Sequence, residues 1–578
     1  MNAASAEYLC TVSPPPPHAL ERHDSSRMSL ADAWIMLALA AVSIFYLAPF
    51  SNTLVFLDRD EGIVLQGATR ILGGELPYRD FFSFYTPGSY YWNAFLLKTF
   101  GDSILVPRAM MVLYGAFFSV LTYGLARRMS PRKDAASVSL LLLVCCLPAR
   151  FVTIHSWDST VAALLALVCA LSLLRSPGPW LAALTGLFTG LTILFNQARG
   201  MGLLLGLVLG FSALKLRKSA AKLNTRHFAW MSALALLPLM LSAAFFGLHG
   251  AFRPMVDGLI WPLLHYSRAN HLPYGYMTMR IADWSALFGD SPLAERALNI
   301  FIISPVFILC ALPIVVVVVA LWCALASRPD LPPGQIDSVI LSGAVLLGSL
   351  LSVIVARPDF LHITFLAPLF FFLLPWLFRS WTAPFPALRK VGPLVMVYGL
   401  MAVSAYGLAL IWPVRNSAIS LETARGTVRL MEFNETIPFI QANFPPGSKL
   451  LVHPYLPLYS FLTRTRSPLR YDFFQPGMHT PEQFQEAADQ LAALKPPAVL
   501  FEPGFGSRIP NSWPNTPISA MIRDPVADYI VRNYRVCRIL DGSAQAPFLF
   551  MVRKDLNCAP RIATSTAPQL LISRKAIH

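Results

Sequence analysis

Long apolar runs recur along this chain of 578 residues, and they restrict its fold more than any other feature. The runs at 34–50, 228–248, 300–326 and 391–412 are each long enough for a helix to cross a hydrocarbon core of about 30 Å. Hydrophobic residues make up 55% of the chain and charged residues only 13%, a composition that excludes a soluble globular protein of this size. We therefore expect a mainly α-helical, polytopic membrane protein.

About eleven membrane spans are predicted. They begin near Trp34, Ile104, Ala135, Ser159, Trp180, Met201, Phe228, Ile300, Ser338, Phe360 and Val391. Basic residues cluster in short loops on one side of these spans, at 127–133, 215–226 and 379–390, and the positive-inside rule makes that side cytoplasmic. The N-terminus is then cytoplasmic. An odd number of spans places the segment after the last one outside the cytoplasm.

The remaining composition divides the chain into three parts. Residues 1–30 are polar and contain four successive prolines, which is typical of a disordered tail, here a cytoplasmic one. Residues 31–412 hold the spans, and residues 413–578 are richer in polar residues and proline, without a further run that could span. The net charge of +15 does not indicate a nucleic-acid partner, because the basic clusters lie in loops that orient the spans.

The last part of the chain reads as a small extracytoplasmic α/β domain. Helices are predicted at 422–444 and 480–494, the second because Thr480 is followed by Pro481 at the first helical position. Strands are predicted at 448–453 and 498–501, and the runs at 535–540 and 548–552 are expected to form a hairpin.

Two cysteines belong to this domain, Cys537 in the first strand of that hairpin and Cys558 just beyond the second. Disulfides persist in the oxidising environment outside the cytoplasm, and such a bond would stabilise the domain by about 3 kcal/mol in the chain-entropy model. The hairpin register is not determined by the sequence, and a Cα separation above about 7 Å would prevent the bond. Both outcomes stay open.

An acidic segment, Asp58-Arg-Asp-Glu-Gly62, follows the first span directly. Charges so close to a bilayer are costly and commonly functional, although a solvated loop would explain them as well. Between two later spans lies Arg357-Pro-Asp-Phe-Leu-His362. The donor fork of an arginine matches phosphate oxygens, whereas a snorkelling arginine beside a structural Asp–His pair is the alternative interpretation. In the predicted topology both segments lie on the external face.

Two further segments lie on that face. Asn196-Gln-Ala-Arg-Gly200 is a tight turn between two spans, which offers an arginine and two amides but is also what a simple helix hairpin requires. The stretch 78–92 is crowded with aromatic residues, which form either an anchoring belt at the membrane interface or the lining of a binding pocket.

These segments together resemble the GT-C superfamily of integral-membrane glycosyltransferases, which contains protein O-mannosyltransferases and the aminoarabinose transferases of lipid A. The resemblance is carried by Asp58-Arg-Asp-Glu-Gly62, Leu76-Pro-Tyr-Arg-Asp80, Tyr85-Thr-Pro-Gly88 and Arg357-Pro-Asp-Phe-Leu-His362. It covers residues 30–412. It implies a GT-C fold in the inner (plasma) membrane and inverting transfer of a sugar from a polyprenyl-phosphate-linked donor. The acceptor would be a lipid, a glycan or a protein on the external face.

The resemblance also implies roles for individual residues. Asp60 would be the general base, and Glu61 would support it or bind a divalent cation; no set of metal ligands and no organic cofactor is predicted. The donor phosphate would be bound by Arg357, His362 and Arg199. Supporting residues would be Asp58, Asp359, Tyr78, Tyr85 and Gln197.

Two other classes of protein stay open at this point. A flippase or transporter of lipid-linked sugars would be polytopic too, but transporters commonly carry ionisable residues within their spans and show internal repeats, whereas here these residues collect at one face. An oligosaccharide polymerase or ligase would use arginine and histidine residues of a large external loop, for which 265–276 is the candidate segment.

Overall fold

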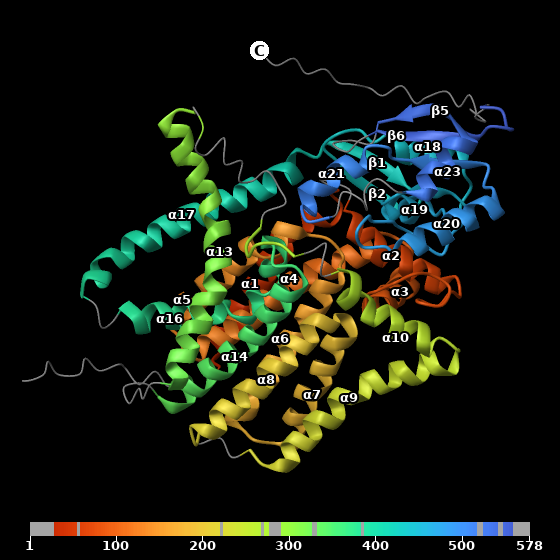
Figure 1. Cartoon of the computed structure of the whole chain (residues 1–578). Coiled ribbons are helices and arrows are strands. Elements are labelled where there is room, and N and C mark those ends of the chain that lie inside the picture. Colours follow the sequence, from red (N-terminus) through yellow and green to blue (C-terminus); the bar gives the residue numbers. More distant parts are fainter. Residues whose placement is uncertain are drawn as a thin grey trace, which may run out of the picture.

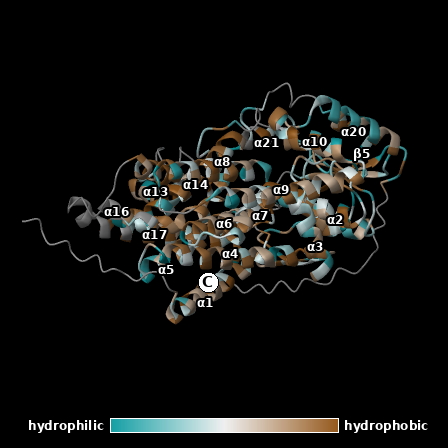
Figure 2. Cartoon of the chain, turned by 90° about the horizontal axis from the view of Figure 1, so that it is seen from below, coloured by the Kyte–Doolittle hydropathy of each residue, from teal (hydrophilic) through white to brown (hydrophobic). Residues whose placement is uncertain are grey.

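The computed structural model of the chain describes residues 28–54, 58–219, 223–266, 271–276, 289, 291–325, 332–382, 386–516, 524–541 and 547–558. These residues form a helical bundle and, at one end of it, a smaller layer of strands and short helices (Figure 1). Apolar residues dominate the bundle in Figure 2, whereas helix α20 (Pro481–Leu494) of the smaller layer is largely hydrophilic. The predicted mainly α-helical, polytopic fold is confirmed.

The bundle contains long apolar helices and a few shorter ones. Its helices are α1 (Leu30–Ser51), α4 (Leu105–Arg127), α5 (Arg132–Cys145), α6 (His155–Arg175), α7 (Pro179–Phe195), α8 (Gln197–Leu216), α9 (Thr225–Leu248), α10 (Phe252–Trp261), α13 (Leu293–Leu325), α14 (Pro333–Ala356), α15 (Phe360–Thr364), α16 (Leu374–Thr382) and α17 (Pro386–Asn416). Short helical turns, η1 (Leu147–Arg150), η2 (Pro262–Tyr266), η4 (Ala367–Leu369) and η5 (Phe371–Leu373), lie between some of them.

Each predicted span lies on a helix, but not every helix is long enough to cross a membrane. Among the described residues eight helices are long and apolar enough, or nine if one bent pair is a single span. Helix α5 has 14 residues and α7 has 17. The run predicted at Phe360 is bent by 58° between its two halves. The predicted number of about eleven spans is thus higher than the eight or nine of the described residues, because apolar content alone does not show where a helix ends early or bends.

Ion pairs join the helix ends that carry two of the basic clusters. The buried carboxylate of Asp32, near the start of α1, pairs with Arg127 at the end of α4 and with Arg132 at the start of α5. Arg379 of α16 pairs with Asp134 of α5 at 2.6 Å. The cluster at 127–133 and Arg379 thus lie at the same end of the bundle, away from the strand layer.

The strands follow the last bundle helix. In the described part of the chain β1 (Ile419–Thr423) and β2 (Gly426–Leu430) form an antiparallel hairpin. A second sheet has the strand order β3-β4-β6-β5, with β3 (Leu451–His453), β4 (Ala498–Phe501), β5 (Tyr534–Leu540) and β6 (Phe548–Arg553), and its β3–β4 pair is parallel. The helices of this layer are α18 (Thr436–Asn443), α19 (Pro457–Thr463), α20, α21 (Phe505–Ser512) and α23 (Pro525–Asn533).

Most predictions for this layer are confirmed. The strands expected at 448–453 and 498–501 are β3 and β4, and the expected hairpin is β5–β6. Helix α20 begins as predicted, since Thr480 caps it in a capping box with Gln483. The helix predicted at 422–444 is wrong in its first half, which belongs to the β1–β2 hairpin.

Two features favour the hairpin over the predicted helix: its local sequence, and hydrogen bonds to a segment far away in the sequence. Gly426 has a φ of 107° at the turn, a conformation that favours glycine. Leu421, Val428 and Leu430 are buried between more exposed neighbours, which is a strand period. Arg429 also exchanges backbone hydrogen bonds with residues 52 and 54, a partner that lies more than 370 positions away.

Helices α2 (Arg59–Leu72) and α3 (Gly88–Phe100) pack against the strand layer, beneath the strands in Figure 1. Leu65 and Leu97 of these helices share one buried apolar core with Leu458, Leu500 and Phe548. The segment that follows the first span is therefore part of the same packed unit as the C-terminal layer, which the sequence did not indicate.

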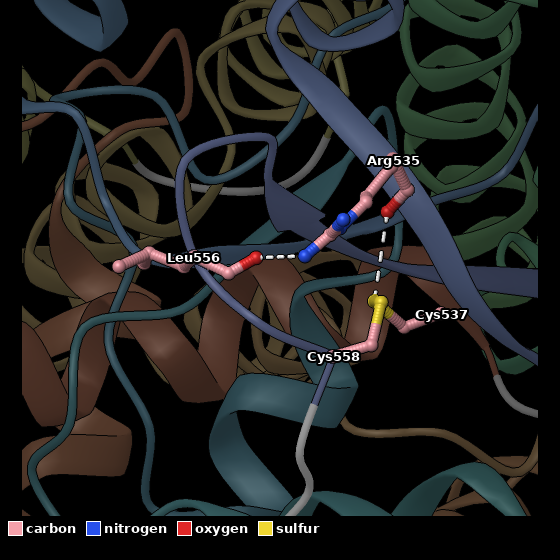
Figure 3. Close-up of a disulfide and its surroundings, with 4 residues drawn as sticks. All are labelled: Arg535, Cys537, Leu556 and Cys558. Atoms are coloured by element: carbon pink, nitrogen blue, oxygen red, sulfur yellow. Dashed lines mark hydrogen bonds between the residues drawn. A yellow bond between two sulfur atoms is a disulfide. The ribbon is translucent and has the colours of Figure 1, made fainter.

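A disulfide joins Cys537 and Cys558, whose Cα atoms are 5.6 Å apart (Figure 3). Cys537 lies where the β5–β6 register shifts, between Val536 and Arg538. The guanidinium of Arg535 donates a hydrogen bond to the backbone carbonyl of Leu556 and so holds the segment after β6 against β5. The register that the sequence left open brings the two sulfur atoms together.

Candidate active site

Helix α2 positions the acidic segment at the junction between the bundle and the strand layer. Asp58 is its N-cap residue and accepts a hydrogen bond from the backbone N–H of Glu61 at 3.0 Å. One turn later, Gly62 faces the start of α19, where an added Cβ would lie 2.3 Å from the backbone nitrogen of Leu458. Glycine is required there because the two backbones approach each other so closely.

A cavity of about 330 Å³ opens beside the start of α2. Its wall comes from α2, from the segment between α5 and α6, from the α7–α8 turn, from the α14–α15 connection and from the strand layer. Eight of the ten residues predicted for the site line this cavity: Asp58, Asp60, Tyr85, Gln197, Arg199, Arg357, Asp359 and His362. The other two, Glu61 and Tyr78, are not among its lining residues. Loops that are far apart in sequence thus meet at one place.

The guanidinium of Arg150 joins the two aspartates. Its Nη2 atom lies 3.1 Å from Asp58 Oδ2 and 2.7 Å from Asp60 Oδ2. On its other oxygen Asp60 accepts a hydrogen bond from the hydroxyl of Tyr455, at 2.7 Å. The Asp60 side chain is 31% exposed, against 8% for Asp58, so Asp60 is the carboxylate more open to a ligand.

The same contacts set the charge of the two carboxylates in opposite ways. Burial raises the pKa of Asp60. The Arg150 guanidinium and the Tyr455 hydroxyl lower it by more than burial raises it, so that the pKa lies below its ordinary value. For Asp58 burial is the dominant effect, and the neighbouring charge of Asp60 adds to it, so that its pKa is raised despite Arg150. Of the two carboxylates, Asp60 is therefore the one whose ionised form its surroundings favour.

Glu61 has a different environment. Its side chain is fully buried and forms a two-pronged ion pair with Arg108, with distances of 2.9 and 2.6 Å. The backbone N–H of Thr153 donates a third hydrogen bond to it at 3.1 Å. Arg108 in turn donates to the backbone carbonyl of Thr53 at 2.7 Å. Glu61 thus ties α2 to α4 and to the start of α6, and both of its oxygens are occupied.

The α14–α15 connection carries a second charged group. Asp359 caps α15 and binds Arg357 Nε at 2.6 Å through one oxygen and His362 Nδ1 at 2.6 Å through the other. Burial raises the pKa of Asp359, but His362 and Arg357 lower it far below its ordinary value, so it is ionised. The guanidinium of Arg357 lies 5.3 Å from the ring centre of Trp513. Arg357 and His362 are thereby fixed in the cavity wall.

Arg199 is held in the wall by neutral groups. It lies one turn into α8, after the cap residue Asn196, and is 3% exposed. Its Nη1 atom donates to the backbone carbonyl of Ser156 and to the hydroxyls of Ser159 and Thr160. Among the described residues no carboxylate pairs with it, and its Nε has no hydrogen-bond partner. A buried cation without a counter-charge is costly unless a ligand supplies one.

The predicted amide and tyrosine residues have supporting positions. Gln197 donates a hydrogen bond to the backbone carbonyl of Phe84 at 3.0 Å. Tyr85 lies against His155, with ring centres 4.0 Å apart. Tyr78 donates to the backbone carbonyl of Tyr85 at 2.7 Å, so it fixes Tyr85 from outside the cavity.

Among the lining residues that sequence reasoning missed are Arg150, Tyr455, Gln475 and Trp513. Arg150 follows an apolar run and carries no motif of its own. The other three come from the C-terminal layer, in which no motif was found. Glycine at position 62 was the available signal, since it marks a helix that another backbone approaches.

In the described part of the chain no group of three or more His, Cys, Asp or Glu side chains is placed to hold a metal ion. A guanidinium, that of Arg150, lies between the two carboxylates nearest the cavity.

Two solved structures of other proteins have a similar architecture. The oligosaccharyltransferase of Archaeoglobus fulgidus in its apo form is similar to the chain with a TM-score of 0.50 and 9% identity, over 84% of this chain and 72% of that one. ArnT from Cupriavidus metallidurans, bound to undecaprenyl phosphate, is similar with a TM-score of 0.50 and 12% identity, over 91% of this chain and 98% of that one. The chain has the GT-C fold.

No family model and no curated protein matches the sequence. At identities of 9% and 12% the similarity concerns the fold alone. Within the GT-C fold, function has to be argued from the cavity and its residues.

Proposed function

We propose that this protein is a glycosyltransferase that moves a sugar from a polyprenyl-phosphate-linked donor to a hydroxyl of a lipid, glycan or protein acceptor. The observation that carries the proposal is the buried guanidinium of Arg199, which pairs with no carboxylate of the described residues. It lies in the wall of a cavity that also contains the partly exposed carboxylate of Asp60. The Arg199 guanidinium needs an anion, and the Asp60 carboxylate can accept a proton. ArnT, which shares the fold, is bound to undecaprenyl phosphate, an anion of this kind.

In this proposal Asp60 is the general base. It accepts the proton of the acceptor hydroxyl while that oxygen forms a bond to the anomeric carbon of the sugar. Arg150 and Tyr455 hold the carboxylate in place and lower its pKa, so it is ionised before the acceptor arrives. A weakly basic carboxylate is sufficient when the transition state has oxocarbenium character, since the leaving group departs before the proton is fully transferred.

The cationic residues stabilise the leaving group, which is the polyprenyl phosphate. As the bond between the anomeric carbon and the phosphate oxygen breaks, the electron pair stays on the polyprenyl phosphate, whose negative charge increases. Arg199 and Arg357 stabilise this charge, and Asp359 keeps Arg357 and His362 oriented toward it. Attack by the acceptor from the side opposite the phosphate inverts the anomeric configuration.

The central test is the change Asp60→Asn in the purified full-length protein. It should lower transfer from an undecaprenyl-phosphate-linked sugar by about 10² to 10⁴, because only the base is lost. Asp489, an exposed carboxylate on α20, provides the matched control, and Asp489→Asn should leave the rate unchanged. Near-normal transfer by Asp60→Asn would remove Asp60 from the role of base.

The same assay separates the proposal from the two other classes of protein. A flippase or transporter moves an intact lipid-linked sugar and forms no new glycosidic bond. A polymerase or ligase would require a preassembled lipid-linked oligosaccharide rather than a single lipid-linked sugar. Part of its candidate segment, 267–270, lies outside the described residues.

We also propose that the N-terminus is cytoplasmic and that the strand layer and the cavity face the exterior of the inner (plasma) membrane. The Cys537–Cys558 disulfide supports this orientation, because such bonds persist in oxidising compartments. A reporter fused after Arg132 should be cytoplasmic, and one fused after Arg415 should be external. A cytoplasmic reporter at Arg415 would place the cavity on the wrong face.

A further inference from the structure

The side-chain amide of Gln475 is completely buried and makes no hydrogen bond with the described residues. It is 0% exposed, and neither its amide oxygen nor its amide nitrogen has a hydrogen-bond partner among the described residues. An amide buried in this way costs free energy, and native proteins rarely keep one without a reason. Gln475 is also a lining residue of the candidate active-site cavity.

The backbone of Gln475 is fixed by hydrogen bonds, so the residue itself is held at the cavity wall. Its N–H donates to Nδ1 of His479 at 3.1 Å, and its carbonyl accepts from the N–H groups of Met478 and His479 at 3.1 and 3.0 Å. His479 is itself enclosed by the rings of Phe474 and Phe484. The turn that carries Gln475 is thus packed and hydrogen-bonded through its backbone, while the Gln475 amide and His479 Nε2 lack hydrogen-bond partners among the described residues.

The cavity wall around Gln475 differs from the opposite wall in charge. The lining residues of the strand layer are Tyr455, Gln475, Met478 and Trp513, all of them uncharged. The rest of the wall carries the guanidinium groups of Arg59, Arg150, Arg199 and Arg357. A ligand with an anionic part and a neutral polar part would place the first against the bundle and the second against the strand layer.

We propose that Gln475 recognises the sugar of the donor, its amide oxygen and nitrogen pairing with two neighbouring hydroxyl groups of a neutral, polyhydroxylated sugar. The inference rests on the proposed function, since it assumes that the phosphate of that donor binds the cationic wall. A carboxamide offers one acceptor and one donor group side by side, which matches a vicinal diol. Gln475 would then determine which sugar is accepted, without taking part in bond breaking.

The change Gln475→Met tests this proposal, because it removes the amide but keeps the length of the side chain. The probes are undecaprenyl phosphate alone and undecaprenyl phosphate linked to glucose, mannose or galactose, measured by native mass spectrometry on the full-length protein in nanodiscs. Gln475→Met should weaken binding of the preferred sugar-linked lipid by roughly ten- to thirtyfold, the effect of two ordinary hydrogen bonds. Binding of undecaprenyl phosphate alone should not change.

Stability of the ligand-free protein gives a second readout. Because Gln475→Met removes an unsatisfied buried amide, it should raise the apparent Tm by about 1–2 °C. Gln485→Met, at an exposed glutamine of α20, is the matched control and should change neither affinity. If Gln475→Met does not fold, Gln475→Ala replaces it in the binding assay.

The outcomes separate this inference from the proposed function. Equal affinity of wild type and Gln475→Met for the sugar-linked lipid would overturn the role of Gln475 and leave the proposed function standing. An equal loss of affinity for both lipids, with a lower Tm, would show a structural role and also overturn it. If the wild-type protein binds neither lipid, the proposed function fails, and the role of Gln475 fails with it.

Discussion

Glu61 and Asp60 are neighbours in sequence, and their replacement should have opposite consequences. Glu61 is paired with Arg108 at 2.9 and 2.6 Å, with side chains 0% and 2% exposed. Glu61→Gln removes the charge and leaves the Arg108 guanidinium buried without a counter-charge, which costs about 3–5 kcal/mol. Asp60 is 31% exposed, and its loss should cost at most about 1 kcal/mol, as for other solvent-accessible ion pairs.

The assay combines thermal unfolding with transfer by the same preparation. The apparent Tm of the full-length protein in detergent, followed by tryptophan fluorescence at one scan rate, should fall clearly for Glu61→Gln and hardly at all for Asp60→Asn. The transfer rate per folded molecule should fall strongly for Asp60→Asn and hardly at all for Glu61→Gln. The double change Glu61→Gln with Arg108→Gln should regain much of the lost stability, because neither partner then leaves a buried charge.

One result would refute this reasoning. If Glu61→Gln unfolds at the wild-type temperature while its transfer rate falls as far as that of Asp60→Asn, Glu61 acts in the chemistry and the ion pair with Arg108 is dispensable. A double variant no more stable than Glu61→Gln alone would contradict the pairwise argument.

Three further predictions concern the wall of the cavity and the C-terminal layer. Arg357→Ala should weaken use of an undecaprenyl-phosphate-linked sugar, and Arg357→Lys should restore it only in part because the donor fork is lost; unchanged donor dependence of the rate would exclude Arg357 from the site. Tyr455→Phe should move the acid limb of kcat/KM to higher pH, since the Tyr455 hydroxyl lowers the pKa of Asp60 and its removal raises it; a pH profile identical to wild type would contradict this. Cys537→Ser should destabilise the C-terminal layer by about 3 kcal/mol, seen as a lower apparent Tm in the absence of reductant. Thiol label found on both Cys537 and Cys558 in the denatured, unreduced wild type would show that these two are not bonded.

The sequence singled out the segments that meet at the cavity because each of them carries its own local signal. Asp58 and Asp60 precede a helix, Asn196 interrupts two apolar runs, and Arg357 and His362 flank a capping aspartate. Loop charge then placed these segments on one face, and the structure brings them to one cavity. Such features depend on residues within one helical turn, which a sequence displays directly.

The roles within the acidic segment could not be predicted in the same way. Asp60 and Glu61 look equivalent in sequence, and their difference comes from Arg150, Tyr455 and Arg108, which lie 90, 395 and 47 positions away. Which carboxylate is exposed depends on which side of α2 faces Arg108 of α4, and that is a tertiary property. The β1–β2 hairpin was missed for a similar reason, since its partner strand segment lies beside the first span.

The shared core of α2, α3 and the strand layer has a consequence for the biogenesis of the protein. Tyr455, which holds the proposed base, is synthesised 395 residues after Asp60, when every bundle helix has already been synthesised. Until then the apolar face of α2 lacks the part of its core that the strand layer supplies, and Arg150 holds the carboxylate without Tyr455. Catalysis would thus be withheld from the growing chain and would begin only when the last domain has crossed the membrane and closed over the first loop. A chain arrested at any earlier point of insertion would occupy the membrane without modifying anything in it.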